Sequence, residues 1–311
     1  MSSARLTLSQ AIDGFFLDRR LKFTEATVEN YRWAFDKFTT YWDDNPTLEA
    51  ITADDVRRFL DDHRELSNTS RRNMHSVLSS LWTWATEEGY ADRHIVRQVT
   101  APEPEQRAVI PFSQADVKAM LRACNKSASY TRPGKKECAN TRPSATRDRA
   151  IVVLLVDTGI RASELCKLRI QDLDLGNGRM KVLGKGVKER LVPVGHTSAR
   201  VLWRYLATRP EAKPIDPVFV ADRTAVTPFG RHSLHRLIRR IGDRAGVVHA
   251  HPHRFRHTFA VNFLRNHGDV YSLQAILGHT TLKMCKIYLA LAQQDTDNAH
   301  RRASPADNWR L

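Results

Sequence analysis

The stretch AIVVLLVDTGIRASELCKL, residues 150–168, decides how the larger part of this chain folds. Its first half is an almost unbroken apolar run, which predicts a helix that is buried on all sides. Gly159 marks a tight turn, since glycine adopts left-handed backbone conformations without a steric penalty. A second helix is expected directly after the turn, so Arg161 lies at the mouth of a helix.

A β-hairpin is predicted further along the chain. The sequence MKVLGKGVKERLVPV, residues 180–194, alternates apolar and polar residues on both sides of Gly184-Lys185-Gly186. This arrangement places Lys185 at the tip of the hairpin. Helical periodicity then resumes over residues 197–208, 229–245, 253–266, 270–277 and 281–291. The fold is therefore expected to be mainly α with a small antiparallel β-sheet.

Residues 6–90 carry the pattern of four helices in a row. In residues 24–42, for example, apolar side chains recur three or four positions apart, which is the spacing of one buried helix face. Thr52 and Asp55 stand at the start of the third helix, where they favour helix initiation. Arg71 and Arg72 lie near the start of the fourth helix, where backbone N–H groups also attract phosphate.

Two segments interrupt these patterns. Residues 98–111 contain three prolines and no apolar period, which is typical of a linker between domains. Residues 125–146 are rich in Lys, Arg, Pro and Ser and include Lys135 and Lys136, which predicts a basic surface loop. We therefore expect an all-helical domain over residues 1–97, the linker, and a larger domain over residues 112–311.

The charge balance points to a polyanionic partner. Among 311 residues, 49 Lys and Arg stand against 34 Asp and Glu, which gives a net charge of +15. Nucleic acid is the leading partner for such a chain, and a membrane surface is the second. No apolar run reaches the roughly 18 residues that span a bilayer, and MSSARLTLSQ lacks the apolar core of a signal peptide, which favours an intracellular protein. The four cysteines form no CxxC pair, so neither a disulfide framework nor a cysteine zinc site is expected.

Six polar residues of the larger domain could carry chemistry: Arg161, Lys185, His253, Arg256, His279 and Tyr288. Each alone has an ordinary structural reading. Arg161 can pair with Glu164, for example, and a lone aromatic residue on a helix usually serves packing. Together they supply two guanidiniums, an ammonium, two imidazoles and a phenol, without an obvious carboxylate partner for every cation.

The histidines at residues 249–257 raise the question of a metal site, because i,i+4 histidines can share a cation. Arg254 and Arg256 stand in the same segment and would repel a cation. No glutamate follows the first histidine as it does in metalloprotease helices, and the GKG sequence lacks the earlier glycine of a phosphate loop. No metal and no cofactor are therefore expected.

Five segments in this order resemble the motif set of the tyrosine recombinases, the phage integrase and Xer family. They are TGIRASEL, GKGVKERLVP, HPHRFRHTFA, LGHTT and the tyrosine nine positions after His279. The resemblance covers residues 147–291, and the helical module before it is similar to the SAM-like core-binding domain of the family. It implies an α+β catalytic domain that breaks and rejoins DNA.

The resemblance also implies a role for each motif residue. Tyr288 is the implied nucleophile, which forms a 3′-phosphotyrosyl intermediate. Arg161 and Arg256 are implied to hold the non-bridging oxygens of the scissile phosphate, and Lys185 to protonate the departing 5′-oxygen. Hydrogen bonding or proton transfer is implied for His253 and His279, and support of the first arginine for Glu164. The side chains expected to contact DNA are Arg71, Arg72, Lys135, Lys136, Lys188 and Arg190.

The expected function is recombination of double-stranded DNA at a specific site, either to integrate or excise a mobile element or to resolve replicons. The implied assembly is a homotetramer on two DNA sites, formed from free monomers or dimers in the cytoplasm, in association with the nucleoid. Two alternatives are a type IB topoisomerase, which relaxes DNA as a monomer, and a non-catalytic DNA-binding relative. Cleavage of one defined sequence followed by strand exchange separates recombination from both.

Overall fold

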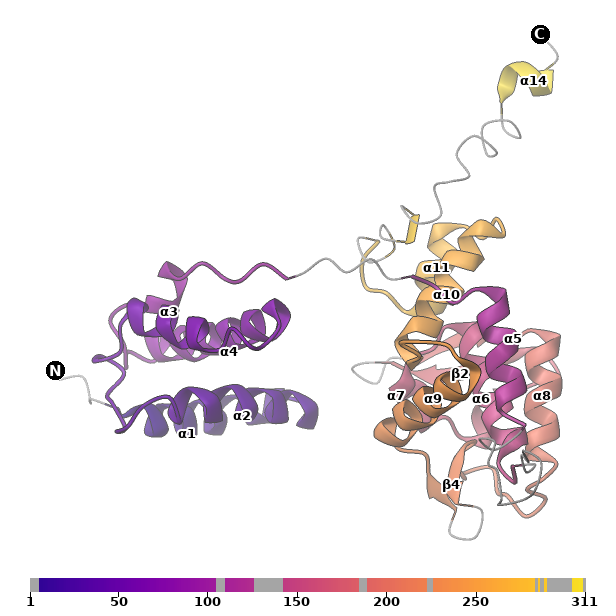
Figure 1. Ribbon diagram of the computed structural model, residues 1–311, viewed down its shortest axis with the longest axis horizontal. Helices are drawn as coiled ribbons and strands as arrows, with labels where there is room; N and C mark the ends of the chain where they lie inside the picture. Colours follow the sequence, from indigo (N-terminus) through magenta and orange to yellow (C-terminus); the bar gives the residue numbers. More distant parts are fainter. Residues whose placement is uncertain are drawn as a thin grey trace, which may run out of the picture. The chain divides into compact units, whose positions relative to one another are not determined.

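The computed structural model describes residues 6–104, 110–125, 142–184, 189–222, 226–282, 285, 288–289 and 304–309. The chain divides into two compact units, residues 1–108 and 109–311, which Figure 1 colours along the sequence. The division falls inside the segment 98–111 that the sequence predicts as a linker. The first unit is helical and the second combines helices with short antiparallel strands, so the predicted fold class is confirmed.

The first unit contains the four predicted helices: α1 (Leu8–Arg19), α2 (Glu25–Thr39), α3 (Ala53–Asp62) and α4 (Asn68–Glu87). Two short 3₁₀ turns accompany them, η1 (Arg20–Lys22) and η2 (Ile95–Gln98). The predicted helix start at Thr52 is confirmed. Asp55 N–H donates to Thr52 Oγ1 at 3.3 Å, and Thr52 N–H donates to Asp55 Oδ2 at 2.9 Å, which satisfies N–H groups that the helix itself cannot.

Aromatic side chains dominate the core of the first unit. Five of them are at most 2% exposed: Phe15, Phe35, Phe38, Phe59 and Trp82. Their rings meet mostly edge to face, as between Phe38 and Phe59, whose centroids are 4.9 Å apart. The helical spacing of three and four residues therefore produces one shared apolar interior.

The second unit is centred on α6 (Ala145–Thr158), which is buried as the sequence predicts. Helices α8 (His196–Leu206) and α10 (Pro252–Arg265) pack on it. Further α-helices of the described part are α5 (Gln114–Ala123), α7 (Ala162–Lys167), α9 (Arg231–Ala245), α11 (Val270–Leu277) and α14 (Pro305–Trp309). Within this unit, α10 and α11 lie at one end and strand β4 at the other (Figure 1).

The predicted hairpin is confirmed as part of a three-stranded antiparallel sheet. The sheet follows η3 (Ile170–Asp172) and contains β1 (Leu173–Asp174), β2 (Arg179–Leu183) and β3 (Glu189–Pro193), in that order. Met180 pairs with Val192 and Val182 with Arg190, and the two-residue period puts Arg190 on the same face as buried Val192. The hairpin tip, residues 185–188, lies outside the described residues.

Three short strands are absent from the sequence prediction: β1, β4 (Val220–Asp222) and β5 (Thr227–Pro228). β4 and β5 form a second antiparallel pair. A strand of two or three residues holds too little apolar–polar alternation to be recognised, so its pairing depends on what packs around it.

None of the described helices is long and apolar enough to cross a membrane. Cys124, Cys166 and Cys285 are free thiols, while Cys138 lies outside the described residues. Burial raises the pKa of Cys124 to about 12 and the pKa of Cys166 to about 11. Both therefore stay protonated and poorly nucleophilic at neutral pH.

Gly159→Ala is expected to destabilise the second unit by roughly 2–5 kcal/mol, from backbone strain and crowding together. The Gly159 backbone is left-handed, with φ of +60°, and a methyl group there would lie 2.5 Å from Cδ1 of Phe259. Gly246→Ala is the matched control, because φ is +67° but a methyl group there meets nothing within 4 Å. The control is expected to lose only about 1–2 kcal/mol. Equal losses in urea unfolding, followed by circular dichroism, would contradict the predicted crowding.

Candidate active site

Arg161 stands where the turn after α6 leads into α7, and Glu164 holds both its backbone and its side chain. Arg161 N–H donates to Glu164 Oε2 at 2.8 Å, and Nη1 donates to Oε1 at 2.9 Å. Nη2 donates to the carbonyl oxygen of Gly278 at 3.3 Å. The side chain is 37% exposed. The guanidinium is thus oriented by the protein and still accessible to a ligand.

Glu164 is the anionic centre of this arrangement. Its side chain is 2% exposed, and it accepts two more hydrogen bonds from Arg190, at 2.8 Å and 2.9 Å. Burial by itself raises the pKa of this carboxyl, but the hydrogen bonds from Arg190 and Arg161 outweigh burial and lower the pKa to about 2. Glu164 is therefore ionised at neutral pH and carries one negative charge between two guanidiniums.

The structure gives Arg190 a use that differs from the predicted DNA contact. Both terminal nitrogens donate to Glu164, and Nε donates to the carbonyl oxygen of Ile276 at 2.8 Å. The side chain is only 15% exposed. Since all three guanidinium nitrogens are bonded to acceptors inside the protein, Arg190 links β3 to α7 and α11.

Arg256 comes from α10 and is 2% exposed. Its Nη1 donates to the carbonyl oxygen of Gly159 at 2.9 Å, and its Nη2 donates to that of Leu277 at 2.7 Å. Burial, and then the positive charge of Arg161, lower the pKa of Arg256 to about 10, so it remains charged at neutral pH. Two guanidiniums that repel each other are thus held at one place by backbone carbonyls.

Tyr288 lies among imidazole rings. Its ring centroid is 5.3 Å from that of His257 and 6.3 Å from that of His279, with the latter pair nearly parallel. His257 in turn lies 4.3 Å from His253, one helical turn earlier on α10. The Tyr288 side chain is 4% exposed and packs in an apolar cluster with Ala260, Val261, Leu273 and Leu277. Its position is therefore set by packing.

The protonation states of these groups follow from burial and from the arginines. Burial raises the pKa of the Tyr288 phenol, whereas the charges of Arg256 and Arg161 act in the opposite direction. Burial, followed by the charge of Arg256, lowers the pKa of His279 to about 4. The imidazole is neutral at pH 7, so it can donate a hydrogen bond from one nitrogen and accept one at the other. Its Nδ1 lies 3.2 Å from Cys285 Sγ.

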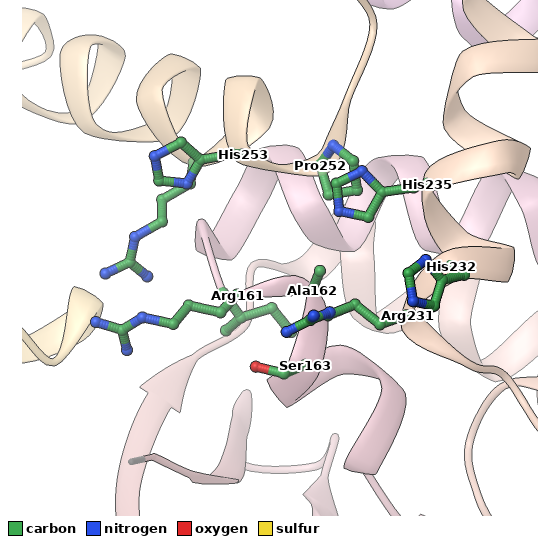
Figure 2. A pocket seen from close by; sticks show the side chains of 10 residues that line it. Arg161, Ala162, Ser163, Arg231, His232, His235, Pro252 and His253 are labelled. Carbon is green, nitrogen blue, oxygen red and sulfur yellow. The ribbon is translucent and has the colours of Figure 1, made fainter. Parts of the chain in front are cut away.

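A pocket of about 600 Å³ opens beside these residues (Figure 2). The polar part of its lining consists of Arg161, Ser163, Arg231, His232, His235, His253 and Arg256. None of the described residues that line it carries a carboxylate. A wall of guanidiniums and imidazoles favours an anion, and the planar fork of arginine matches the oxygens of a phosphate.

Three basic members of this lining are absent from the sequence prediction: Arg231, His232 and His235. A signal was present, since RHSLHRLIRR, residues 231–240, is a dense run of basic groups on an amphipathic helix. Such a run is more often a solvated helix face. Only the packing of α9 beside α7 shows that this run forms part of the pocket wall.

The predicted catalytic residues Arg161, His253, Arg256, His279 and Tyr288 meet in one connected set of contacts of the second unit. Four predicted lysines lie outside the described residues: Lys135, Lys136, Lys185 and Lys188. Among the described residues, no group of three or more His, Cys, Asp and Glu side chains could hold a metal ion.

Arg71 and Arg72, predicted to contact DNA, belong to the first unit. Arg71 is half-buried and its Nη1 donates to the carbonyl oxygen of Leu60 at 3.5 Å. Arg72 is exposed, and its Nη1 donates to the carbonyl oxygen of Pro102 at 3.1 Å. Arg72 is thus the more accessible of the two.

The second unit is expected to lose stability as the pH falls below 6.5, the ordinary pKa of histidine. Burial lowers the pKa of His257 to about 4 in the folded chain. Between these two values the unfolded chain binds more protons, so the contribution of His257 is fully present above pH 6.5 and is lost as the pH falls toward 4. The full loss is on the order of 3 kcal/mol.

The measurement is urea unfolding across this pH range for the wild type and for His257→Gln. The variant lacks the titrating ring, so its free energy of unfolding is expected to fall less steeply with decreasing pH. An unchanged slope would contradict a buried, neutral His257.

The sequence profiles of two families match this chain. The one described as "Phage integrase family" matches residues 112–295, and the one described as "Phage integrase, N-terminal SAM-like domain" matches residues 12–89. The tyrosine recombinase XerC of Oceanobacillus iheyensis is 30% identical over 265 residues, which covers 83% of this chain and 82% of the relative.

Two solved structures share the fold. The XerH site-specific recombinase, bound to its palindromic difH substrate in a post-cleavage complex, has a TM-score of 0.69 at 20% identity, covering 96% of this chain and 85% of that one. A lambda integrase tetramer bound to a Holliday junction has a TM-score of 0.71 at 18% identity, covering 90% and 79%. With a family profile that matches more than half of its residues, the chain belongs to the phage integrase family and is a tyrosine-type site-specific recombinase.

Proposed function

We propose that Tyr288 attacks a phosphodiester of double-stranded DNA and forms a 3′-phosphotyrosyl ester. In this step the bond between Tyr288 Oη and phosphorus forms while the bond between phosphorus and the 5′-oxygen breaks. The phenol gives its proton to the neutral imidazole of His279, and Lys185 gives one to the departing 5′-oxygen. The ester retains the energy of the broken bond, so attack by a 5′-hydroxyl of the partner strand rejoins DNA without ATP.

The observation that carries this proposal is the meeting of Arg161 and Arg256 beside Tyr288, at a pocket without a carboxylate on its described wall. Negative charge grows on the non-bridging oxygens in the transition state, and guanidiniums already aimed at them stabilise that charge without reorganising. Loss of one such donor typically slows a reaction by about 10²–10³-fold. The arginines would supply the positive charge that a metal ion supplies in other phosphoryl-transfer enzymes.

The imidazoles of His253 and His279 have separate tasks in this proposal. His253 lines the pocket and is exposed, so it can hydrogen-bond a phosphate oxygen. His279 is buried, and its neutral ring lies near that of Tyr288, so it can bond the phosphate or help to move the phenolic proton. Glu164 keeps the Arg161 guanidinium in place by accepting a hydrogen bond from Nη1 at 2.9 Å.

We extend the proposed DNA surface from this site along α9. Arg231, His232 and His235 line the same pocket and would meet backbone phosphates next to the scissile one. Arg72 would contribute a phosphate contact from the first unit. Binding is then expected to weaken with salt, as counterion release requires.

The biological reaction proposed is recombination between two DNA sites by a homotetramer, either integrating or excising a mobile element or resolving replicons in the nucleoid. The fold supports it, since the lambda integrase of the same fold has been solved as a tetramer on a Holliday junction. The net charge of +15 supports an extended contact with DNA.

The test uses DNA that flanks the gene, offered as fragments carrying a nick that traps cleaved product. The wild type is expected to yield protein-linked DNA at one sequence on a denaturing gel, and two intact sites are expected to exchange strands. Relaxation of supercoiled DNA at many sequences without exchange would indicate a topoisomerase. Specific binding by the wild type without any adduct would contradict the proposal.

A further inference from the structure

Three arginine side chains donate hydrogen bonds to the carboxyl end of α11. The successive carbonyl oxygens of residues 276–278 accept hydrogen bonds from Arg190 Nε at 2.8 Å, Arg256 Nη2 at 2.7 Å and Arg161 Nη2 at 3.3 Å. The last carbonyls of a helix have no partner within the helix and carry the negative end of its dipole. The end of α11 therefore forms a negative edge on which guanidiniums from β3, α10 and the start of α7 rest.

Arg190 joins this edge to Glu164. Its Nε bonds the end of α11, while Nη1 and Nη2 bond Oε1 and Oε2 of Glu164. The same Oε1 also accepts from Arg161 Nη1 at 2.9 Å. Arg190 reaches this position because it shares the inner face of β3 with Val192.

The guanidinium of Arg190 also packs against the turn that ends α11. Gly278 has a left-handed backbone, with φ of +64°, and a methyl group there would lie 3.1 Å from Nε and 3.2 Å from Cδ and Cζ of Arg190. The side chain and the turn therefore fit closely. The next residue after this turn is His279.

We propose that Arg190 is a positioning residue of the recombination site, which fixes Glu164, and through it Arg161, to the end of α11 on which Arg256 also rests. The inference depends on the proposed function, in which Arg161 and Arg256 hold the scissile phosphate. Arg190 acts through these groups, since its own three nitrogens are bonded inside the protein.

A lysine cannot take over this task. Its single ammonium has no planar fork that could meet both oxygens of Glu164 and a backbone carbonyl at once. Arg190→Lys keeps the charge and loses the geometry, whereas Arg190→Met loses both. The pair of variants therefore separates a positioning effect from an effect of charge alone.

The pH dependence supplies a second signature. In Arg190→Met, Glu164 loses two of the hydrogen bonds that lower its pKa, while the burial that raises its pKa stays. The pKa of Glu164 in this variant is therefore expected to lie above that in the wild type. Its cleavage rate is expected to fall at a higher pH than the wild-type rate when the solution is acidified, because a protonated Glu164 no longer pairs with Arg161.

The experiment is single-turnover cleavage of a nicked recombination site at saturating protein, with the affinity for the intact site measured separately. Arg190→Met and Arg190→Lys are both expected to cleave roughly 100-fold more slowly than the wild type, the typical effect of a misplaced group, with dissociation constants within about threefold. The double variant Arg190→Met/Glu164→Gln is expected to be no slower than the slower single variant, because both changes break the same linkage.

Arg179→Met is the matched control. Arg179 is exposed on the paired strand β2, so this change removes the same charge from the hairpin without touching Glu164 or α11. It is expected to cleave at the wild-type rate. Circular dichroism reports whether each variant is folded, and if Arg190→Met is not, Arg190→Lys carries the test.

Wild-type cleavage by a folded Arg190→Met protein would overturn the inference. Full activity of Arg190→Lys would also overturn it, because only the positive charge of Arg190 would then matter. Rate losses that multiply in the double variant would overturn it too, because the two changes would then act independently. A wild type that forms no adduct would instead overturn the proposed function, and this result is distinct because it appears before any Arg190 variant is compared.

Discussion

A Tyr288→Phe protein is expected to bind its recombination site as the wild type does and to form no covalent adduct with DNA. The change removes only the phenolic oxygen. The ring stays in its apolar cluster with Ala260 and Leu277, where the side chain is 4% exposed, and phenylalanine fills the same space. Folding and the phosphate contacts of Arg161 and Arg256 should therefore survive, while the nucleophile is gone.

The expected loss of cleavage is roughly 10⁶-fold, the order found when another enzyme loses its nucleophile, and this puts the reaction below detection. The measurement is a denaturing gel of labelled DNA after incubation with saturating protein. Tyr271→Phe is the matched control, because Tyr271 is 69% exposed on α11 and undergoes the same chemical change. Protein-linked DNA from Tyr288→Phe would disprove the assignment, and mapping the linked residue would name the true nucleophile.

Lys185→Ala is expected to slow cleavage of ordinary DNA by about 10²–10⁴-fold, the usual contribution of a general acid. The 5′-oxygen is a poor leaving group, and the proposed task of Lys185 is to protonate it as the bond to phosphorus breaks. Sulfur in place of the bridging 5′-oxygen leaves without needing a proton. Lys185→Ala is therefore expected to cleave the sulfur-substituted site nearly as fast as the wild type does.

Two controls make this test specific. Arg161→Ala should not be rescued by sulfur, because its charge acts on the non-bridging oxygens, which the substitution leaves unchanged. Lys188→Ala removes the next lysine along the sequence and should cleave ordinary DNA faster than Lys185→Ala does. If Lys185→Ala and Arg161→Ala respond alike to sulfur, or if Lys188→Ala shows the rescue, the proton comes from another residue.

The parts of the fold that were predictable share a strong local pattern. The four helices of the first unit, buried α6 and the β2–β3 hairpin each repeat their apolar spacing over enough residues to be recognised. The short strands β4 and β5 have no such repeat, and their pairing depends on the elements around them. In the same way, the sequence does not distinguish Arg231 from the other basic residues of its helix, although Arg231 lines the pocket beside Arg161.

The sequence by itself determined the longer helices, the β2–β3 hairpin and the reactive groups that the chain carries, because apolar period, glycine turns and motif spacing are local properties. Only the tertiary structure decided which partner each charged group binds. Arg190 reads as one more basic residue of a hairpin, yet its partners are Glu164, 26 positions away, and Ile276, 86 positions away. Likewise Arg161 reaches a carbonyl 117 positions along the chain. A local pattern cannot encode such pairings. They arise because packing removes water, so that each buried guanidinium must hydrogen-bond to the acceptors that the fold places near it.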